Sequence, residues 1–158
     1  MNYKILEQDA FNVIGVSQRI SFSEGNAMFT EFWNRVRKGE IYQKMEAVSN
    51  HKIPGMLAMM SDYNEDHTEM TIMLGFTTDE ESSLEELEVY SFPKATWLVA
   101  EVVGRPSKVM SKAWDQLTLD IIPSTPYEEA DLPQFEAYIA DSFTNVDSVN
   151  EIWIPLIH

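Results

Sequence analysis

The sequence contains no cysteine among its 158 residues. Disulfide bonds, thiolate metal sites and cysteine nucleophiles are therefore excluded. Basic residues are scarce as well: 11 Lys and Arg stand against 26 Asp and Glu, which gives a formal net charge of −15 at pH 7. A nucleic-acid binder needs a basic surface that neutralises phosphates, so direct nucleic-acid binding is not expected. The acidic surplus promotes solubility and raises the local concentration of cationic ligands.

Long hydrophobic runs are also missing. The longest uncharged apolar stretch, residues 53–61, is far shorter than the roughly 20 residues that span a bilayer. Glu7 interrupts the N-terminal segment before the apolar region of a signal peptide can form. We therefore expect a soluble, cytoplasmic protein without membrane contact, a compartment that the absence of cysteine also suits.

Nucleotide-binding and nucleophile motifs are absent, and no cofactor is expected. One polar segment contains several candidate metal ligands, but they have no known ligand spacing. We interpret this segment as a solvated turn and expect no metal; its members are Asp62, Glu65, Asp66, His67 and Glu69.

The sequence does contain a repeat with a period of about eighty residues. Two segments place apolar residues at positions i, i+3, i+4 and i+7, which is the spacing of one buried stripe on an amphipathic helix. The stripes are Phe29, Phe32, Trp33 and Val36 in the first segment and Met110, Ala113, Trp114 and Leu117 in the second. This pattern assigns Trp33 and Trp114 to the core.

Each helical segment is preceded by one predicted strand and followed by two. The strands are residues 11–16, 56–60 and 70–74 in the first repeat, and 95–100, 135–139 and 152–156 in the second. The repeats, residues 1–76 and 87–158, are joined by an acidic linker at 77–86. Two β-α-β-β units can pair edge to edge. This predicts an α+β fold in a single domain over residues 1–158: one antiparallel sheet, two helices on one face and a ligand groove on the other.

Side chains alternate along a strand, so the closing strands can be assigned to faces. Ile152, Ile154 and Leu156 form an aliphatic set suited to packing under helices, which turns Glu151 and Trp153 toward the groove. By the same reasoning, Phe135 and Ala137 pack under the helices while the intervening residues face the groove. Superposition of the first repeat adds the apolar side chains of Leu57, Met59 and Ile72 to that surface. Nothing local fixes the face of Trp97.

The predicted ligand-binding set therefore combines two carboxylates with aromatic, methionine and aliphatic side chains. Its members are Leu57, Met59, Ile72, Trp97, Glu136, Tyr138, Glu151 and Trp153. Such a set suits a flat, hydrophobic cation, because rings stack on Trp or Tyr and a carboxylate supplies the counter-charge. Methionine lets the wall adapt to different shapes. Taken alone, either glutamate is also compatible with an ordinary solvent-facing strand position.

The segment Phe135-Glu136-Ala137-Tyr138, followed by Glu151-Ile152-Trp153-Ile154-Pro155, resembles the closing motif of GyrI-like domains, which are AraC-type effector-binding domains. The resemblance covers nearly the whole chain. It implies a stand-alone bacterial effector-binding domain in which Glu136 and Glu151 face the ligand. The family includes effector domains of transcription regulators, some of which bind cationic drugs. It also includes proteins described as gyrase modulators and a subgroup that hydrolyses cyclopropane-bearing natural products.

Three functions follow as hypotheses. The first is a binding module for amphipathic, aromatic or cationic small molecules, acting as a sensor or a sequestering protein. The second is a hydrolase of electrophilic small molecules in which Glu136 or Glu151 activates water. The third is an acidic partner of another protein, such as a topoisomerase. Two carboxylates that converge on one ligand position would favour the enzyme, whereas a binder needs only one buried carboxylate.

Overall fold

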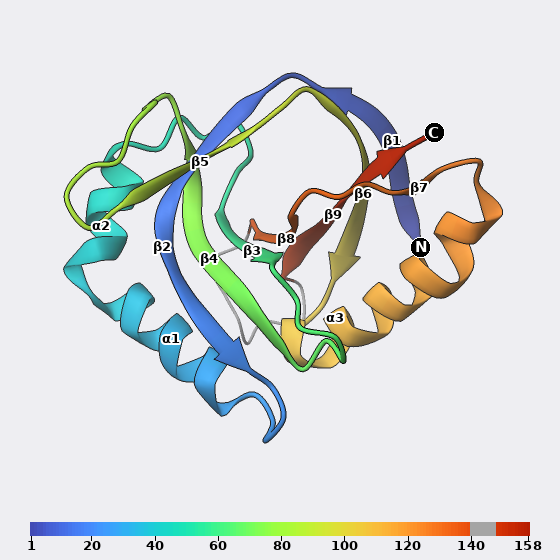
Figure 1. Cartoon of the computed structure of the whole chain (residues 1–158), viewed down its shortest axis with the longest axis horizontal. Helices are drawn as coiled ribbons and strands as arrows, with labels where there is room; N and C mark the ends of the chain where they lie inside the picture. The colour runs from blue at the N-terminus through green and yellow to red at the C-terminus, as the bar shows by residue number, and fades with distance from the viewer. Residues whose placement is uncertain (140–147) are drawn as a thin grey trace.

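The computed structural model describes residues 1–139 and 148–158, and its centre is one nine-stranded antiparallel sheet (Figure 1). The strands are β1 (Asn2–Gln8), β2 (Phe11–Ser21), β3 (Met56–Ser61), β4 (Glu69–Thr78), β5 (Glu88–Phe92), β6 (Ala95–Val103), β7 (Glu128–Glu129), β8 (Gln134–Tyr138) and β9 (Val149–Ile157). Eight of them follow the order β1-β6-β9-β8-β3-β4-β2-β5, and β7 pairs with β9. The predicted α+β fold with a single antiparallel sheet is confirmed.

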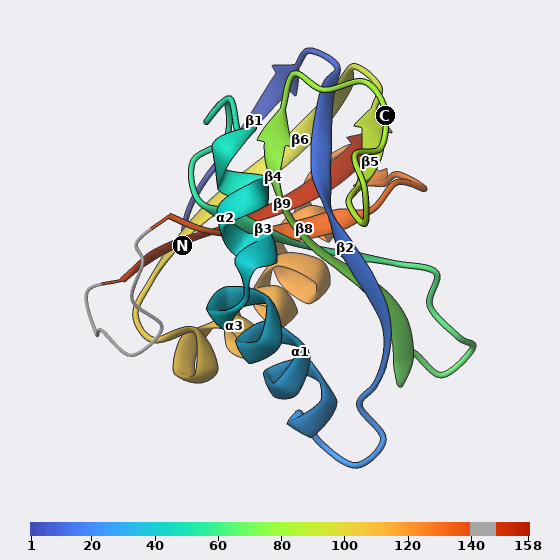
Figure 2. The same cartoon turned by 90° about the vertical axis from the view of Figure 1, so that its left-hand side faces the viewer.

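Both predicted helices are present. They are α1 (Ala27–Lys38) and α3 (Pro106–Asp115), and α3 continues into a π-helical segment (Gln116–Ile121) and a short 3-10 turn (Ile122–Ser124). The helix α2 (Glu40–Ala47) follows α1 directly, and its apolar stripe is too short to be recognised from the sequence. Figure 2 shows α1 and α3 on the same side of the strands. No helix in the described part of the chain is long and apolar enough to cross a membrane.

The strand order is symmetric about the boundary between β3 and β8. Exchanging β1 with β5, β2 with β6, β3 with β8 and β4 with β9 leaves the order unchanged. Each predicted β-α-β-β unit is preceded by an additional strand, which pairs with the other half: β1 with β6 and β5 with β2. This exchange joins the two repeats into one sheet, and the predicted linker begins within β4.

The helix side of the sheet holds two apolar cores. Under α1 and α2, side chains of β2, β3 and β4 pack against Phe32, Trp33, Val36 and Met45. Under α3, side chains of β6 and β9 pack against Met110, Ala113 and Leu117. The aliphatic residues Ile152, Ile154 and Leu156 belong to this second core, as alternation along β9 predicts.

The helix-free side holds a group of packed rings that we call the aromatic cluster: Phe11, Phe92, Trp97, Phe135 and Trp153. The ring centroids of Phe135 and Trp153 are 5.3 Å apart with stacked planes. Phe11 of β2 and Trp97 of β6 approach to 6.2 Å, although four strands separate β2 from β6 in the sheet. The sheet therefore curls toward this side, and rings fill the middle of the face where a groove is predicted.

Gly15 of β2 and Gly75 of β4 are directly paired. A Cβ atom on Gly15 would come within 2.2 Å of the Leu74 carbonyl oxygen, and one on Gly75 would come as close to that of Ile14. No other residue fits this approach of the two backbones. The glycine pair therefore permits the tight passage of the strands.

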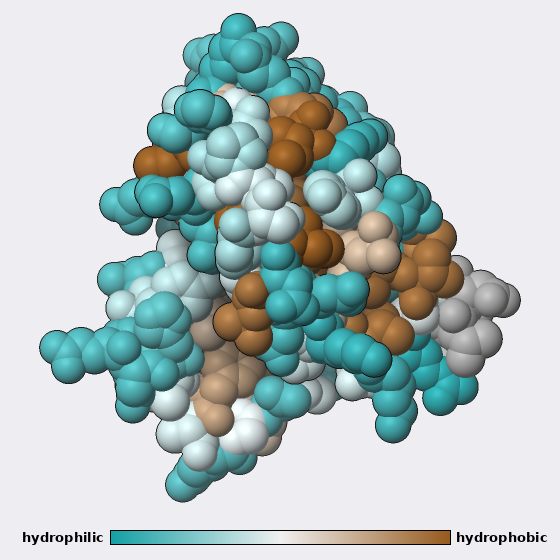
Figure 3. Space-filling model, turned by 90° about the vertical axis from the view of Figure 1, so that its right-hand side faces the viewer, coloured by the Kyte–Doolittle hydropathy of each residue, from teal (hydrophilic) through white to brown (hydrophobic). Residues whose placement is uncertain are grey.

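Strand β1 forms one edge of the sheet. Figure 3 shows the surface of the side that lies on the right in Figure 1, where α3 and β1 are found. Hydrophilic residues cover most of this side, in keeping with the net charge of −15, and hydrophobic groups emerge between them. The exposed large apolar side chains of the described chain include Met1, Tyr3, Val103, Leu119 and Ile157. Leu119 is 70% exposed.

Candidate functional site

Strand β8 places Glu136 on the face of the sheet that carries the helices. Glu136 pairs directly with Ile152, and Phe135 pairs with Trp153. Directly paired residues of antiparallel strands point to the same face. Ile152 packs under α3, whereas Trp153 belongs to the aromatic cluster. Glu136 and, two residues later, Tyr138 therefore face the helices.

The prediction that Glu136 and Tyr138 share one groove with Glu151 and Trp153 is wrong. The latter two lie on the helix-free face, where Trp153 Nε1 donates a hydrogen bond to Glu151 Oε1 at 3.1 Å. The alternation of side chains along β8 does not identify the helix face, because large side chains occur at both odd and even positions and both faces of the strand are covered. The register with β9 decides which face each side chain takes.

The apolar members of the predicted set also divide between the two faces. Leu57, Met59 and Trp97 lie on the helix-free face, whereas Ile72 packs under α1 and α2. The prediction that Ile72 shares a surface with Met59 is wrong, because Met59 pairs with Met73 and the neighbouring Ile72 points the other way. The predicted residues are thus not brought together into one site.

On the helix face, Glu136 is held by two neutral donors. Trp114 Nε1, from the end of α3, donates to Glu136 Oε2 at 2.7 Å, and the Tyr138 hydroxyl donates to Oε1. The Tyr138 ring meets the ring of Trp33 on α1 edge to face, with centroids 4.9 Å apart. The tyrosine that donates to Glu136 therefore also packs against a tryptophan of the first repeat.

Trp33 and Trp114 are the site residues that sequence reasoning misses. Their positions in the apolar stripes of the two helices assign them to the core, and Trp33 is indeed buried. Both occupy the i+4 position of their stripe, so they are equivalent in the two repeats. This equivalence is the signal that could have marked them, because the pseudo-symmetric sheet turns equivalent positions toward the boundary between β3 and β8.

The Glu136 carboxylate has no counter-charge among the described residues. Burial raises its pKa above the ordinary value of 4.5, and the hydrogen bonds from Tyr138 and Trp114 oppose this effect only in part. No ion pair of the described chain involves Glu136, and residues 140–147 contain no Lys, Arg or His. Burial also raises the pKa of Tyr138 well above 10. The site therefore offers an uncompensated acidic group.

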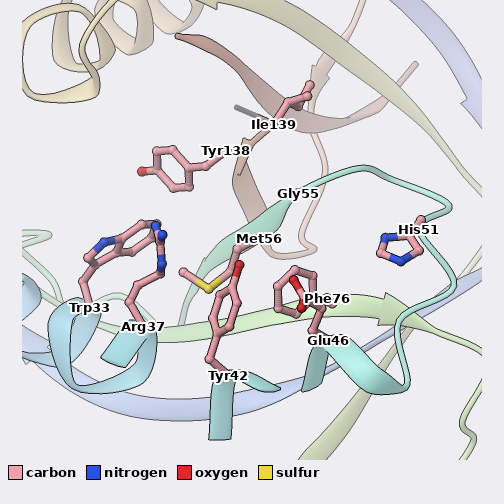
Figure 4. A pocket seen from close by; sticks show the side chains of 10 residues that line it. All are labelled: Trp33, Arg37, Tyr42, Glu46, His51, Gly55, Met56, Phe76, Tyr138 and Ile139. Carbon is pink, nitrogen blue, oxygen red and sulfur yellow. The ribbon is translucent and has the colours of Figure 1, made fainter. Parts of the chain in front are cut away.

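A cavity of about 190 Å³ lies beside Tyr138, between α1, α2 and the strands (Figure 4). Its walls are Trp33, Arg37, Tyr42, Glu46, His51, Gly55, Met56, Phe76, Tyr138 and Ile139. Glu136 is not a lining residue, but Tyr138 lines the cavity and is hydrogen-bonded to Glu136. Tyr138 thus connects the cavity to the carboxylate.

The aromatic walls of this cavity already hold one cation. The Arg37 guanidinium carbon lies 5.7 Å from the Trp33 ring centroid and 5.4 Å from that of Tyr42. In Figure 4 the Arg37 side chain extends alongside Trp33. Both distances are within the roughly 6 Å at which a cation is attracted by a ring face. Trp33 and Tyr42 therefore already make cation–π contacts with Arg37 in the wall of the cavity.

The geometry also bears on catalysis and on metals. Glu136 and Glu151 point to opposite faces of the sheet, so they cannot act on one ligand together. Within residues 1–139 and 148–158, no group of three or more His, Asp or Glu is arranged to hold a metal ion. The chemistry that remains available at Glu136 is the binding of a cation or the transfer of a proton by a single carboxyl group.

We expect the raised pKa of Glu136 to make the protein less stable as the pH rises above 4.5. Between that value and the higher pKa of the folded state, the folded protein binds more protons than the unfolded protein, so the free energy of unfolding falls with pH. The loss cannot exceed about 1.4 kcal/mol per pH unit. Urea denaturation of the wild type and Glu136→Gln across this range measures it. Parallel profiles of the two proteins would contradict the assignment.

A family model described as Cass2, an integron-associated effector binding protein, matches residues 4–156. No curated protein sequence matches the chain significantly.

Solved structures share the fold at low identity. SAV2435 bound to tetraphenylphosphonium is 18% identical with a TM-score of 0.82, over 99% of this chain and 94% of that chain. A putative transcription regulation protein from Staphylococcus aureus MU50 is 18% identical with a TM-score of 0.78, over 100% and 99%. EcmrR in a DNA complex is 11% identical with a TM-score of 0.73, over 98% of this chain and 57% of that chain.

Proposed function

Because the chain belongs to the Cass2 family of integron-associated effector binding proteins, a GyrI-like family, we propose that it binds amphipathic organic cations between α1, α2 and β8. The binding residues are Glu136 as counter-charge, Tyr138 and Trp33 as aromatic walls, and Trp114 as a competing donor to the carboxylate. The site differs from the groove predicted from the sequence, but it retains Glu136 and Tyr138.

The observation that carries this proposal is the carboxylate of Glu136, which is partly buried beside aromatic rings and bonded only to neutral donors among the described residues. A carboxylate that is withdrawn from water without a cationic partner keeps an uncompensated desolvation cost. A cationic ligand compensates that charge, whereas an anionic ligand adds a second one. The net charge of −15 further concentrates cations at the surface.

Ligand entry requires side chains to move. The cavity of about 190 Å³ is smaller than typical ligand pockets of roughly 300–1,000 Å³. Rotation of Tyr138 and Trp114 away from Glu136 enlarges the space and exposes the carboxylate. Met56 in the wall can adopt several rotamers and adapt to ligands of different shape.

Two related structures support a role as a sensor or sequestering protein. SAV2435 is bound to tetraphenylphosphonium, an aromatic cation. EcmrR is a DNA-binding protein, and this chain corresponds to just over half of it, with 57% covered. A sensor built on this domain would pass the binding signal to a separate DNA-binding component, since an acidic domain repels phosphates.

We expect isothermal titration calorimetry to show one tetraphenylphosphonium bound per chain, with a dissociation constant of about 1–100 μM. The affinity should rise with pH as Glu136 ionises, because only the carboxylate compensates a cation. The anion tetraphenylborate has nearly the same shape and is the matched control. Binding of tetraphenylborate as tight as that of the cation would refute the proposal.

A further inference from the structure

We propose a second binding site, on the helix-free face between β2, β3, β4 and β5, that takes small alkylammonium ions. The site is a cavity of about 140 Å³. It is lined by Ser17, Met59, Ser61, Thr71, Met73, Glu88, Val89, Tyr90 and Pro133. It shares no lining residue with the cavity beside Tyr138, and the sheet separates the two.

The apolar part of this site is formed by two methionines. Met59 of β3 and Met73 of β4 are directly paired and are only 3% and 6% exposed. Thioether sulfurs are polarizable and pack well against methyl groups. Tyr90 of β5 contributes an aromatic ring, and such rings attract alkylated ammonium ions. This combination of ring and thioethers suits a cation whose charge is spread over methyl groups.

The negative charge of the site comes from Glu88. Its carboxylate accepts a hydrogen bond from the Ser17 hydroxyl, and this bond fixes it at the cavity. Burial raises the pKa of Tyr90, and the negative charge of the nearby Asp131 raises it further. Glu88 takes part in no ion pair of the described chain, so its charge is available to a ligand.

Arg19 is a cationic side chain that contacts the lining of the site. Its guanidinium donates a hydrogen bond to Thr71 Oγ1 at 3.3 Å. It also forms ion pairs with Asp62 and Glu69, each at 3.1 Å. These two carboxylates balance its charge. Arg19 therefore does not neutralise the charge of Glu88.

The size of the cavity selects the ligand. A volume of about 140 Å³ accommodates a trimethylammonium group with a short tail, but not an ion that carries several phenyl rings. Because Glu88 is exposed to solvent, its charge is screened and the affinity should be millimolar. The site would thus distinguish small ammonium ions from the aromatic cations proposed for the helix side.

The NMR signals of methionine methyl groups distinguish ligand binding at the two sites. Met56 lines the cavity beside Tyr138, whereas Met59 and Met73 line the second site. In the protein labelled with ¹³C-methyl methionine, choline should shift the NMR signals of Met59 and Met73 and leave that of Met56 in place. The neutral isostere 3,3-dimethyl-1-butanol should bind at least about 5-fold more weakly.

Glu88→Gln should weaken choline binding about 5-fold, and the fold is preserved because Glu88 is exposed. Ser17→Ala is a second variant that removes the hydrogen bond holding the carboxylate, and it should weaken binding by a smaller factor. Glu151→Gln removes a carboxylate that lies on the same face but does not line the site; it is the matched control and should leave choline binding unchanged. The proposal would be overturned if choline shifted the signal of Met56 alone or left those of Met59 and Met73 in place. It would also be overturned by equal affinity for the neutral isostere or by unchanged choline binding in Glu88→Gln.

Discussion

Glu136→Gln is expected to weaken tetraphenylphosphonium binding by about 30- to 150-fold, a loss of about 2–3 kcal/mol. The substitution removes the charge and leaves the shape. The glutamine oxygen can still accept the hydrogen bond from Trp114 Nε1, and its amide can donate to the Tyr138 oxygen. The fold should therefore persist, and calorimetry measures the loss of the electrostatic contribution alone.

Two controls separate charge from shape in this experiment. Triphenylphosphine oxide is an uncharged triaryl ligand, and its affinity should be nearly the same for Glu136→Gln and the wild type. Glu151→Gln removes a carboxylate from the helix-free face, where Trp153 Nε1 is its partner at 3.1 Å, and should not change tetraphenylphosphonium binding. Equal losses for the charged and the neutral ligand, or an equal effect of Glu151→Gln, would show that Glu136 is not the counter-charge.

Phe135→Ala is expected to lower the free energy of unfolding by about 3–5 kcal/mol. Phe135 is fully buried and stacks on Trp153 with centroids 5.3 Å apart. Its ring centroid also lies 5.3 Å from that of Trp97 and 5.9 Å from that of Phe92. Removing the ring leaves a cavity between the two ends of the curled sheet. Urea denaturation measures the loss.

Because Phe135 lies on β8, Phe135→Ala also tests which face of this strand binds the ligand. Phe135 points away from the helices, so in the folded protein Phe135→Ala should bind tetraphenylphosphonium with nearly wild-type affinity. Phe135→Leu fills much of the space and should lose less stability. Leu119→Ala, at a position that is 70% exposed, should change stability by no more than about 0.5 kcal/mol. A loss below about 1 kcal/mol in Phe135→Ala would mean that the aromatic cluster does not hold the curled sheet together.

Much of the fold follows from patterns that are local in the sequence. The spacing of Phe29, Phe32, Trp33 and Val36 reappears about eighty residues later, and these stripes predict both α1 and α3. The two strands after each helix, and the aliphatic face of β9, follow from composition and alternation. Strands β1 and β5 were not predicted, because an edge strand is half-covered and shows no clear alternation: β1 is mostly exposed.

The sequence alone determined the repeated unit, the acidic charge and the family, because periodicity, composition and a short motif are properties of neighbouring residues. Only the tertiary structure decided which face of β8 meets the helices. The register between β8 and β9 pairs Glu136 with Ile152, and a shift by one residue would turn every side chain of β8 to the other face. Both faces of this strand are covered, one by helices and one by rings from the curled sheet, so burial leaves no signature in the sequence. The same register turns Glu136 toward Trp114, which is 22 positions away in the chain.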